Sequence, residues 1–332
     1  MTTRLEEVAE LAGVSRASAS RVLNGRSGTS ARTRDAVLTA LDVLGYRRPA
    51  AARAEPGSLI GLVVPDLRNP IFPAFADLIA AALVRRGLVP LLCTRTADGV
   101  SEADHIEMLL AHGTGGVIFI GGSLADAGPE HRRTLTERGL PVVLVNAADD
   151  HPGAATVAVD DAAAVDKALA HLADLGHRRI GLVAGPDGHA PSDRKVAAFA
   201  ARLPHMPVGH AMFTAEGGRA TAARLLDAQV TGLVCASDAL ALGAIRAVRR
   251  RGLEVPRDVS VIGFDDSAHM PVTDPPLTTL RQPVAAIAAA AVAALTTRIA
   301  TGPAGHGGQA GGLVFEPELI VRETTGPPPR KA

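Results

Sequence analysis

Short apolar runs of strand length alternate with amphipathic helical stretches from residue 59 onward, and this alternation constrains the fold more than any other feature of the chain. The runs are almost entirely apolar, which is typical of parallel strands buried on both faces. Strands are expected at residues 59–64, 89–93, 116–120, 142–146, 179–184, 231–236 and 259–264. Helices are expected between them, at residues 73–86, 101–112, 129–138, 161–175, 192–203, 217–228 and 239–251. The pattern predicts a core of two successive, doubly wound parallel α/β subdomains rather than one oversized sheet.

The first 46 residues have a helical pattern without strand-like runs. Thr3, with a Glu three positions further on, opens a capping box, and Ser15 and Ser30 can cap two further helices. Three helices this short must pack together to bury their apolar faces. Residues 1–46 are therefore predicted to form a separate three-helix domain.

The remaining domain boundaries follow changes in composition. Residues 47–57 are rich in Ala, Arg and Pro and end in Pro-Gly, which predicts a hinge or linker. Residues 58–326 are expected to form the α/β core, with subdomains at roughly 58–157 and 158–280 joined by C-terminal crossovers. Residues 327–332 are expected to be a tail.

Composition limits the class of protein. No apolar run approaches the roughly 18 uninterrupted residues of a membrane span, and the charged N-terminus lacks the apolar stretch of a secretory signal. Cys93 and Cys235 each lie in or beside an apolar run, which opposes a disulfide framework or a cysteine-ligated metal. We therefore expect a soluble, cytoplasmic protein. The net charge is zero, so whole-chain charge gives no argument for nucleic-acid binding, although residues 1–60 carry nine Arg against six acidic residues.

The second predicted helix has the composition of a DNA-recognition helix. It follows a Gly-containing turn, and its first turn reads Ser-Arg-Ala-Ser. Short polar and cationic side chains in the N-terminal half of such a helix reach base edges and phosphates, so the pattern favours a helix-turn-helix. The alternative is a generic three-helix cap with a solvated charged face. The polar set consists of Ser15, Arg16, Ser18, Ser20, Arg21 and Asn24.

Several motifs together resemble one family. LEEVAELAGVSRASASRVLNG, then SARTR and LGYR, is similar to the DNA-binding headpiece of the lactose and galactose repressor (LacI/GalR) family. Downstream, VPDLRNPIF, DLGHRRIG, SDALALGA, GLEVPRDVSVIGFDD and PPLTTLRQP resemble that family in the same order. The resemblance implies a homodimeric transcription regulator with a headpiece, a hinge helix and an effector-binding core related to periplasmic sugar-binding proteins.

The resemblance also implies which residues contact DNA. Arg16 and Ala17 occupy the two recognition-helix positions that most vary operator preference in the family. The other positions matching DNA contacts, many of them to phosphates, are Thr3, Ser15, Ser20, Arg21, Asn24, Thr33, Tyr46 and Arg53.

Asp238 and Asp265 match family positions that contact effector hydroxyls. Both directly follow strand runs, and ligands of open parallel sheets bind outside the carboxyl ends of strands. The alternative for these carboxylates is helix N-capping. The other effector candidates implied by the resemblance are Phe72, Asn146, Arg194 and Lys195.

Three departures from the family pattern affect these assignments. The Arg that usually follows the position of Asn146 is absent, because the next residue is Ala147. The spacing of the effector Arg falls on Lys195, with Arg194 one position earlier, and both stay candidates. Phe72 matches a cleft-lining aromatic, but an Ile rather than a second aromatic precedes it, and simple core packing is its alternative.

The hinge also departs from the family, in which a Leu near its end wedges into the minor groove. Counting from Tyr46, the equivalent position is Glu55. Such wedges are apolar, and a carboxylate would face phosphates instead. We therefore expect operator kinking by this route to be weak or absent.

Other chemistry has little support. The eleven His residues show no metal-ligand spacing, and neither a G-x-G-x-x-G turn after a strand, a P-loop Lys nor a G-x-S-x-G elbow occurs. We expect no metal, no cofactor and no catalysis. The sequence predicts a repressor that binds a pseudo-palindromic DNA operator as a homodimer and responds to a small polar, sugar-like effector. The alternatives are a small-molecule binding protein or sugar-processing enzyme whose N-terminal bundle does not bind DNA, and a regulator with a vestigial cleft.

Overall fold

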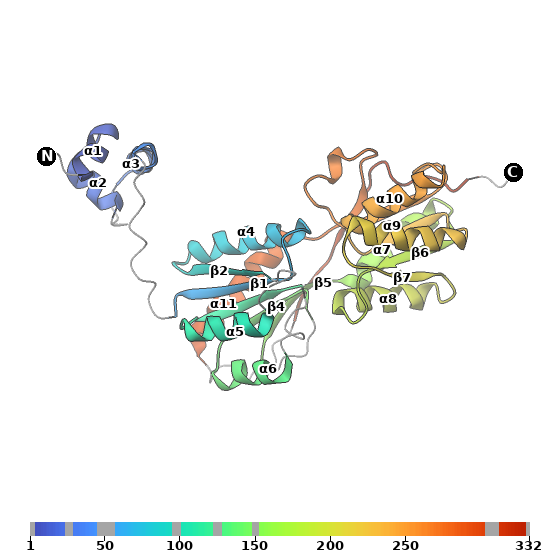
Figure 1. Ribbon diagram of the computed structural model, residues 1–332, viewed down its shortest axis with the longest axis horizontal. Coiled ribbons are helices and arrows are strands. Elements are labelled where there is room, and N and C mark those ends of the chain that lie inside the picture. Colours follow the sequence, from blue (N-terminus) through green and yellow to red (C-terminus); the bar gives the residue numbers. More distant parts are fainter. Residues whose placement is uncertain are drawn as a thin grey trace. The chain divides into compact units, whose positions relative to one another are not determined.

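The computed structural model describes residues 4–23, 29–44, 57–94, 101–121, 128–147, 153–302 and 312–329. The chain forms two compact units, Met1–Glu55 and Pro56–Ala332. Figure 1 shows the elements of both units.

The N-terminal unit contains three helices, α1 (Arg4–Leu11), α2 (Arg16–Leu23) and α3 (Ala31–Val43). Ser15 accepts the Ser18 N–H at 3.2 Å, which confirms the predicted cap of α2. Ser30 accepts the Thr33 N–H at 3.1 Å and caps α3 in the same way. A small apolar core holds the helices together and consists of Val8, Ala9, Ala19, Val37, Ala40 and Leu41.

The C-terminal unit begins with a parallel sheet in the order β11-β5-β4-β3-β1-β2. Helices α4 and α11 cover one face, and α5 and α6 cover the other. The strands are β1 (Leu59–Val64), β2 (Val89–Thr94), β3 (Gly116–Ile120), β4 (Val142–Val145), β5 (Ala155–Val159) and β11 (Leu313–Phe315). The helices are α4 (Ile71–Val84), α5 (Glu102–Ala111), α6 (Gly128–Glu137) and α11 (Val284–Thr301).

A second sheet has the order β12-β10-β9-β8-β6-β7, with β12 alone antiparallel to its neighbour. Helices α7 and α8 pack on one face, and α9 and α10 on the other. The strands are β6 (Ile180–Ala184), β7 (Val208–His210), β8 (Gly232–Cys235), β9 (Ser260–Asp265), β10 (Thr278–Arg281) and β12 (Glu318–Ile320). The helices are α7 (Asp161–Asp174), α8 (Ala190–Arg202), α9 (Ala215–Asp227), α10 (Asp238–Arg250) and the 3-10 turn η2 (Met270–Val272).

The chain crosses between the two sheets three times, between β5 and α7, between β10 and α11, and between β11 and β12. The first subdomain is therefore completed by the late elements α11 and β11, after the second sheet has been built. Two doubly wound subdomains joined by crossovers confirm the predicted fold class. The crossovers also bring Asp161 and Gln282 to the junction between the subdomains.

Helix α11 is long and apolar enough, by length and composition, to cross a bilayer, with a mean hydropathy of 1.7. One of its faces is nevertheless buried in the core against α4 and strands β3 to β5. The buried residues are Ile287, Ala288, Ala291, Val292 and Leu295. This inward face is typical of a core helix in a globular domain.

Candidate functional site

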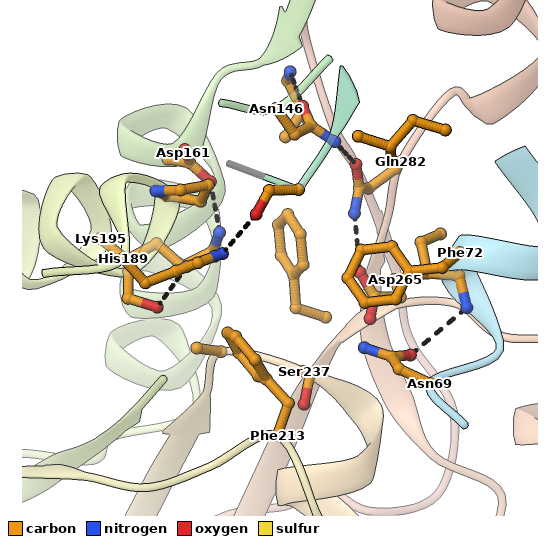
Figure 2. Close-up of a pocket in the computed structure, with 18 of the residues that line it drawn as sticks. Asn69, Phe72, Asn146, Asp161, His189, Lys195, Phe213, Ser237, Asp265 and Gln282 are labelled. Carbon is orange, nitrogen blue, oxygen red and sulfur yellow. Dashed lines mark hydrogen bonds and ion pairs between the residues drawn. The ribbon is translucent and has the colours of Figure 1, made fainter. Parts of the chain in front are cut away.

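The carboxyl ends of strands from both sheets meet at a cavity of about 50 Å³. Figure 2 shows side chains from both subdomains pointing into it. The first sheet and its loops contribute Asn69, Phe72, Gly121 and Asn146, and the second contributes His189, Lys195, Phe213, Ser237, Phe264 and Asp265. Asp161 and Gln282 enter from the crossovers. Of the predicted effector residues, Phe72, Asn146, Lys195 and Asp265 thus lie together around one space.

Lys195 occupies the centre of a buried electrostatic cluster. Its ammonium pairs with Asp161 and lies 3.9 Å from the centroid of the Phe264 ring. The second oxygen of Asp161 accepts the Arg194 Nε–H at 2.9 Å. The side chains of Asp161 and Lys195 are 1% and 6% exposed, respectively, so both are removed from water.

The structure separates the two basic candidates that the spacing left open. Lys195 lines the cavity, whereas Arg194 does not. Arg194 also donates from Nη1 to the Ala147 carbonyl at 3.3 Å, and so links α8 to the end of β4. Asp161, which holds both cations, was not among the sequence candidates. It lies two residues after the end of β5, and because no strand was expected at residues 155–159, no signal in the sequence indicated it.

A chain of amide and carboxyl groups crosses the junction between the subdomains. Asn146 Nδ2 donates to Gln282 Oε1 at 2.8 Å, and Gln282 Nε2 donates to Asp265 Oδ1 at 2.7 Å. The Asn146 oxygen accepts the Val159 N–H at 2.9 Å. Burial, with a contribution from the charge of Asp238, raises the pKa of Asp265 well above its usual value. Asn146 thus lies in the site, although Ala147 replaces the Arg that often follows this position in the family.

Asp238 lies beneath the cavity and is not one of the residues that line it. Its two oxygens accept the Ser267 N–H at 2.7 Å and the Thr279 hydroxyl at 2.6 Å. Burial raises its pKa to about 6, against the lowering effect of these hydrogen bonds. The N-cap of α10 is Ser237, which accepts the Leu240 N–H, so Asp238 does not cap this helix. This placement favours a positioning role for Asp238 over direct effector contact.

His189 bridges the two subdomains at the edge of the cavity, a role that no sequence pattern indicated. Its Nε2 lies 3.1 Å from the Gly121 carbonyl oxygen, and Nδ1 lies 3.1 Å from the Ser192 hydroxyl. Because a carbonyl only accepts, Nε2 carries the proton. Burial lowers the pKa of His189. Gly121 has φ +81°, and a Cβ there would lie 2.8 Å from the Phe72 ring, so this approach requires glycine.

The headpiece presents its predicted DNA contacts on two helices. Arg16, Ala17 and Arg21 are exposed on α2, and Thr33 is half-buried in the first turn of α3. Arg16 Nη1 forms an ion pair with Glu6 of α1 at 3.0 Å, and its side chain is 61% exposed. Ser15 directly precedes α2, and Ser20 lies in the middle of that helix. The predicted contacts Thr3, Asn24, Tyr46 and Arg53, and the hinge residue Glu55, lie outside the described residues.

Neither metal nor thiol chemistry is evident in the described part of the chain. No group of three or more His, Cys, Asp or Glu side chains within it is arranged to hold a metal ion. Cys93 and Cys235 are both buried and free.

Comparisons with known proteins agree with this architecture. Residues 4–49 match the model for bacterial regulatory proteins of the lacI family, and residues 169–325 match a periplasmic binding protein-like domain. A Streptomyces limosus protein called an uncharacterized HTH-type transcriptional regulator in the aml 5' region is 49% identical, over 97% of this chain and 94% of its own length. The HTH-type transcriptional regulator reg1 of Streptomyces lividans is 47% identical, over 99% and 98%.

Two solved structures resemble the whole chain. The transcriptional regulator CelR in complex with cellobiose has a TM-score of 0.70 at 30% identity and covers 97% of this chain and 100% of its own. The lac repressor dimer bound to operator and the anti-inducer ONPF has a TM-score of 0.71 at 25% identity and covers 98% and 99%.

A helix-turn-helix unit joined to a periplasmic-binding-protein-like α/β core defines a DNA-binding transcriptional regulator rather than an enzyme. The chain belongs to the LacI family of bacterial regulatory proteins.

Proposed function

We propose that this regulator is a cytoplasmic repressor that binds a pseudo-palindromic operator as a homodimer and releases or tightens its hold when a sugar binds the cavity. The operator-bound lac repressor dimer and the cellobiose-bound CelR support this proposal, since both share the fold over nearly their whole length. The cavity supplies the chemistry that sugars need, because amide, hydroxyl and carboxyl groups line it together with four Phe rings.

The observation that carries the proposal is the set of polar contacts across the junction. His189 reaches Gly121, Arg194 reaches Ala147, and Gln282 joins Asn146 to Asp265. An effector that hydrogen-bonds to these groups must compete with the contacts that hold the subdomains in this arrangement. Effector binding and subdomain arrangement are therefore coupled.

The size of the cavity supports the same coupling. Ligand sites for small molecules span roughly 300–1,000 Å³, and this cavity measures about 50 Å³. A disaccharide enters only after the subdomains separate or the lining rearranges. If only one arrangement sets the headpieces at operator spacing, a coupling of roughly 1–3 kcal/mol, or 5- to 150-fold in operator affinity, is sufficient for a switch.

A gel shift with fragments of the surrounding genome, in the presence and absence of cellobiose, lactose and glucose, tests the proposal. We expect one fragment to bind specifically and one sugar to change its affinity. Asp265→Asn should bind the same fragment and lose the sugar response, whereas Asp187→Asn, an exposed control on the β6–α8 loop, should keep both. Absence of any specific fragment would contradict the DNA-binding role.

A further inference from the structure

The ionisable side chains that line the cavity include an ion pair between Asp161 and Lys195. Among the described residues that line it, the ionisable side chains are Asp161, His189, Lys195 and Asp265. His189 is neutral near pH 7 because burial lowers its pKa. Lys195 is thus the single cation of this lining, and two carboxyl groups accompany it.

The Lys195 ammonium is already paired with a carboxylate. Its ammonium is paired with Asp161 and lies over the Phe264 ring, with 6% of the side chain exposed. Arg194, the second cation near the site, uses its Nε–H on the other oxygen of Asp161 and Nη1 on the Ala147 carbonyl. One buried carboxylate therefore engages both basic side chains.

Two helix N-termini at the cavity carry side-chain caps, whereas α8 has none, although its first turn contains Pro191, which lacks an N–H, and the acidic Asp193. Helix N-termini attract anions through their free N–H groups. At α7 the Asp160 side chain accepts the Ala163 N–H at 2.8 Å, and at α10 the Ser237 hydroxyl accepts the Leu240 N–H at 3.2 Å. A phosphate or carboxylate at the start of α7 or α10 would have to displace these caps.

We propose that Asp161 acts as a charge filter that restricts the effector to uncharged, hydroxyl-rich molecules and excludes sugar phosphates and sugar acids. An anion entering this space would lie beside the Asp161 carboxylate, which already pairs with Lys195 and Arg194, whereas sugar hydroxyls can both donate to and accept from the amide and carboxyl lining. This inference rests on the proposed function, because it names the class of effector that the same cavity accepts.

The test uses thermal melting of the full-length protein at constant ionic strength, so that no operator is needed. In the first arm, glucose and cellobiose are compared with their 6-phosphates, and each phosphorylated sugar is expected to bind the wild type at least roughly ten-fold more weakly than its neutral partner. In the second arm, inorganic phosphate replaces chloride. Wild type should not respond, whereas Asp161→Asn, which frees Lys195, should gain a phosphate-dependent rise in Tm.

Asp166→Asn is the matched control, since this carboxylate on the same helix pairs with Arg202 at the surface and its loss frees a cation away from the cavity. It should gain no phosphate response. The inference is wrong if a phosphorylated sugar or phosphate stabilises wild type and Lys195→Gln loses this effect. It is also wrong if Asp161→Asn folds but its Tm rises with phosphate no more than that of Asp166→Asn.

If Asp161→Asn does not fold, the comparison of wild type with Lys195→Gln still tests the inference. The Tm of both proteins should then be unchanged by phosphate. If no sugar of the panel binds, the phosphate arm still decides. Failure of the proposed function is a separate result, because it requires that no specific DNA fragment is bound in the gel shift.

Discussion

Protonation of the His189 imidazole should lower the stability of the core as pH falls. Its neutral form bridges to Gly121, and burial holds its pKa below 6.5 in the folded protein. The charge of Lys195 lowers this pKa further, and Asp161 and Asp193 raise it. The unfolded chain therefore takes up the proton first as pH falls from about 6.5, and the stability contributed above that pH is progressively lost.

We predict that His189→Gln, which keeps an N–H donor but cannot titrate, loses less stability than wild type between about pH 7 and pH 5. Unfolding by urea at a series of pH values measures this difference. Superimposable pH profiles for the two proteins would show that His189 does not carry the effect.

Asp238 is expected to matter for stability more than for effector contact. Asp238→Ala leaves the Ser267 N–H and the Thr279 hydroxyl without their buried acceptor, which costs about 2–4 kcal/mol of unfolding free energy. The pKa of this carboxyl is raised to about 6, so its stabilisation is full below about pH 4 and is lost as pH rises through 6. The deficit of the variant should therefore shrink between about pH 4 and pH 6 in urea titrations and change little above about pH 7. If the variant is as stable as wild type at pH 5, Asp238 is not a positioning residue, and direct effector contact becomes the favoured role.

Within the headpiece, we expect helix α2 to combine two kinds of DNA contact. We expect Arg16, in its first turn, to reach a guanine edge once it leaves Glu6, and Arg21, in its last turn, to contact phosphates. We predict that Arg16→Ala lowers discrimination at one half-site position by about 1–3 kcal/mol and that Arg21→Ala weakens binding to all sequences. Fluorescence anisotropy on operator and random DNA distinguishes the two. Equal weakening of both DNAs by Arg16→Ala would exclude base reading.

For the hinge, the expected effect on operator bending rests on the sequence alone. If Glu55 stands where relatives use an apolar wedge, the operator should bend little, and Glu55→Leu should increase both affinity and bend angle. Circular-permutation gel shifts compare the two proteins. A strongly kinked wild-type complex, or no change in the variant, would place the hinge in another register or outside the groove.

Most elements with strong internal signals were predicted, although the long apolar helix α11 was not, and short strands that depend on distant partners were missed. Strands such as β3 and β6 are buried along their whole length and therefore appear as uninterrupted apolar runs. Strands β7, β11 and β12 have three residues each, with exposed or half-buried side chains, and owe their conformation to pairing across the sheet.

The same limit applies to the site. Asn146, Lys195 and Asp265 follow from motifs, and the structure brings them together. Asp161 and His189 gain their roles only from the crossovers and from the contact between subdomains. No spacing along the chain encodes those contacts, so local patterns could not reveal them.

At the scale of the whole molecule, one sheet is completed by elements that return from the other, and the cavity lies at the crossovers. A change in the angle between the subdomains therefore alters the cavity and every crossover segment together. In a homodimer this change would also move the segments that lead to the two headpieces. Effector and operator would then act on one shared equilibrium.

Reciprocal titration measures this coupling between effector and operator. The operator affinity is measured by anisotropy with and without a saturating neutral disaccharide, and the disaccharide affinity is measured by calorimetry with and without operator. Linkage requires the same factor in both directions, which we expect to lie at about 5- to 150-fold and to disappear in Asp265→Asn. A disaccharide that binds the cavity with equal affinity in the presence and absence of operator would contradict the account.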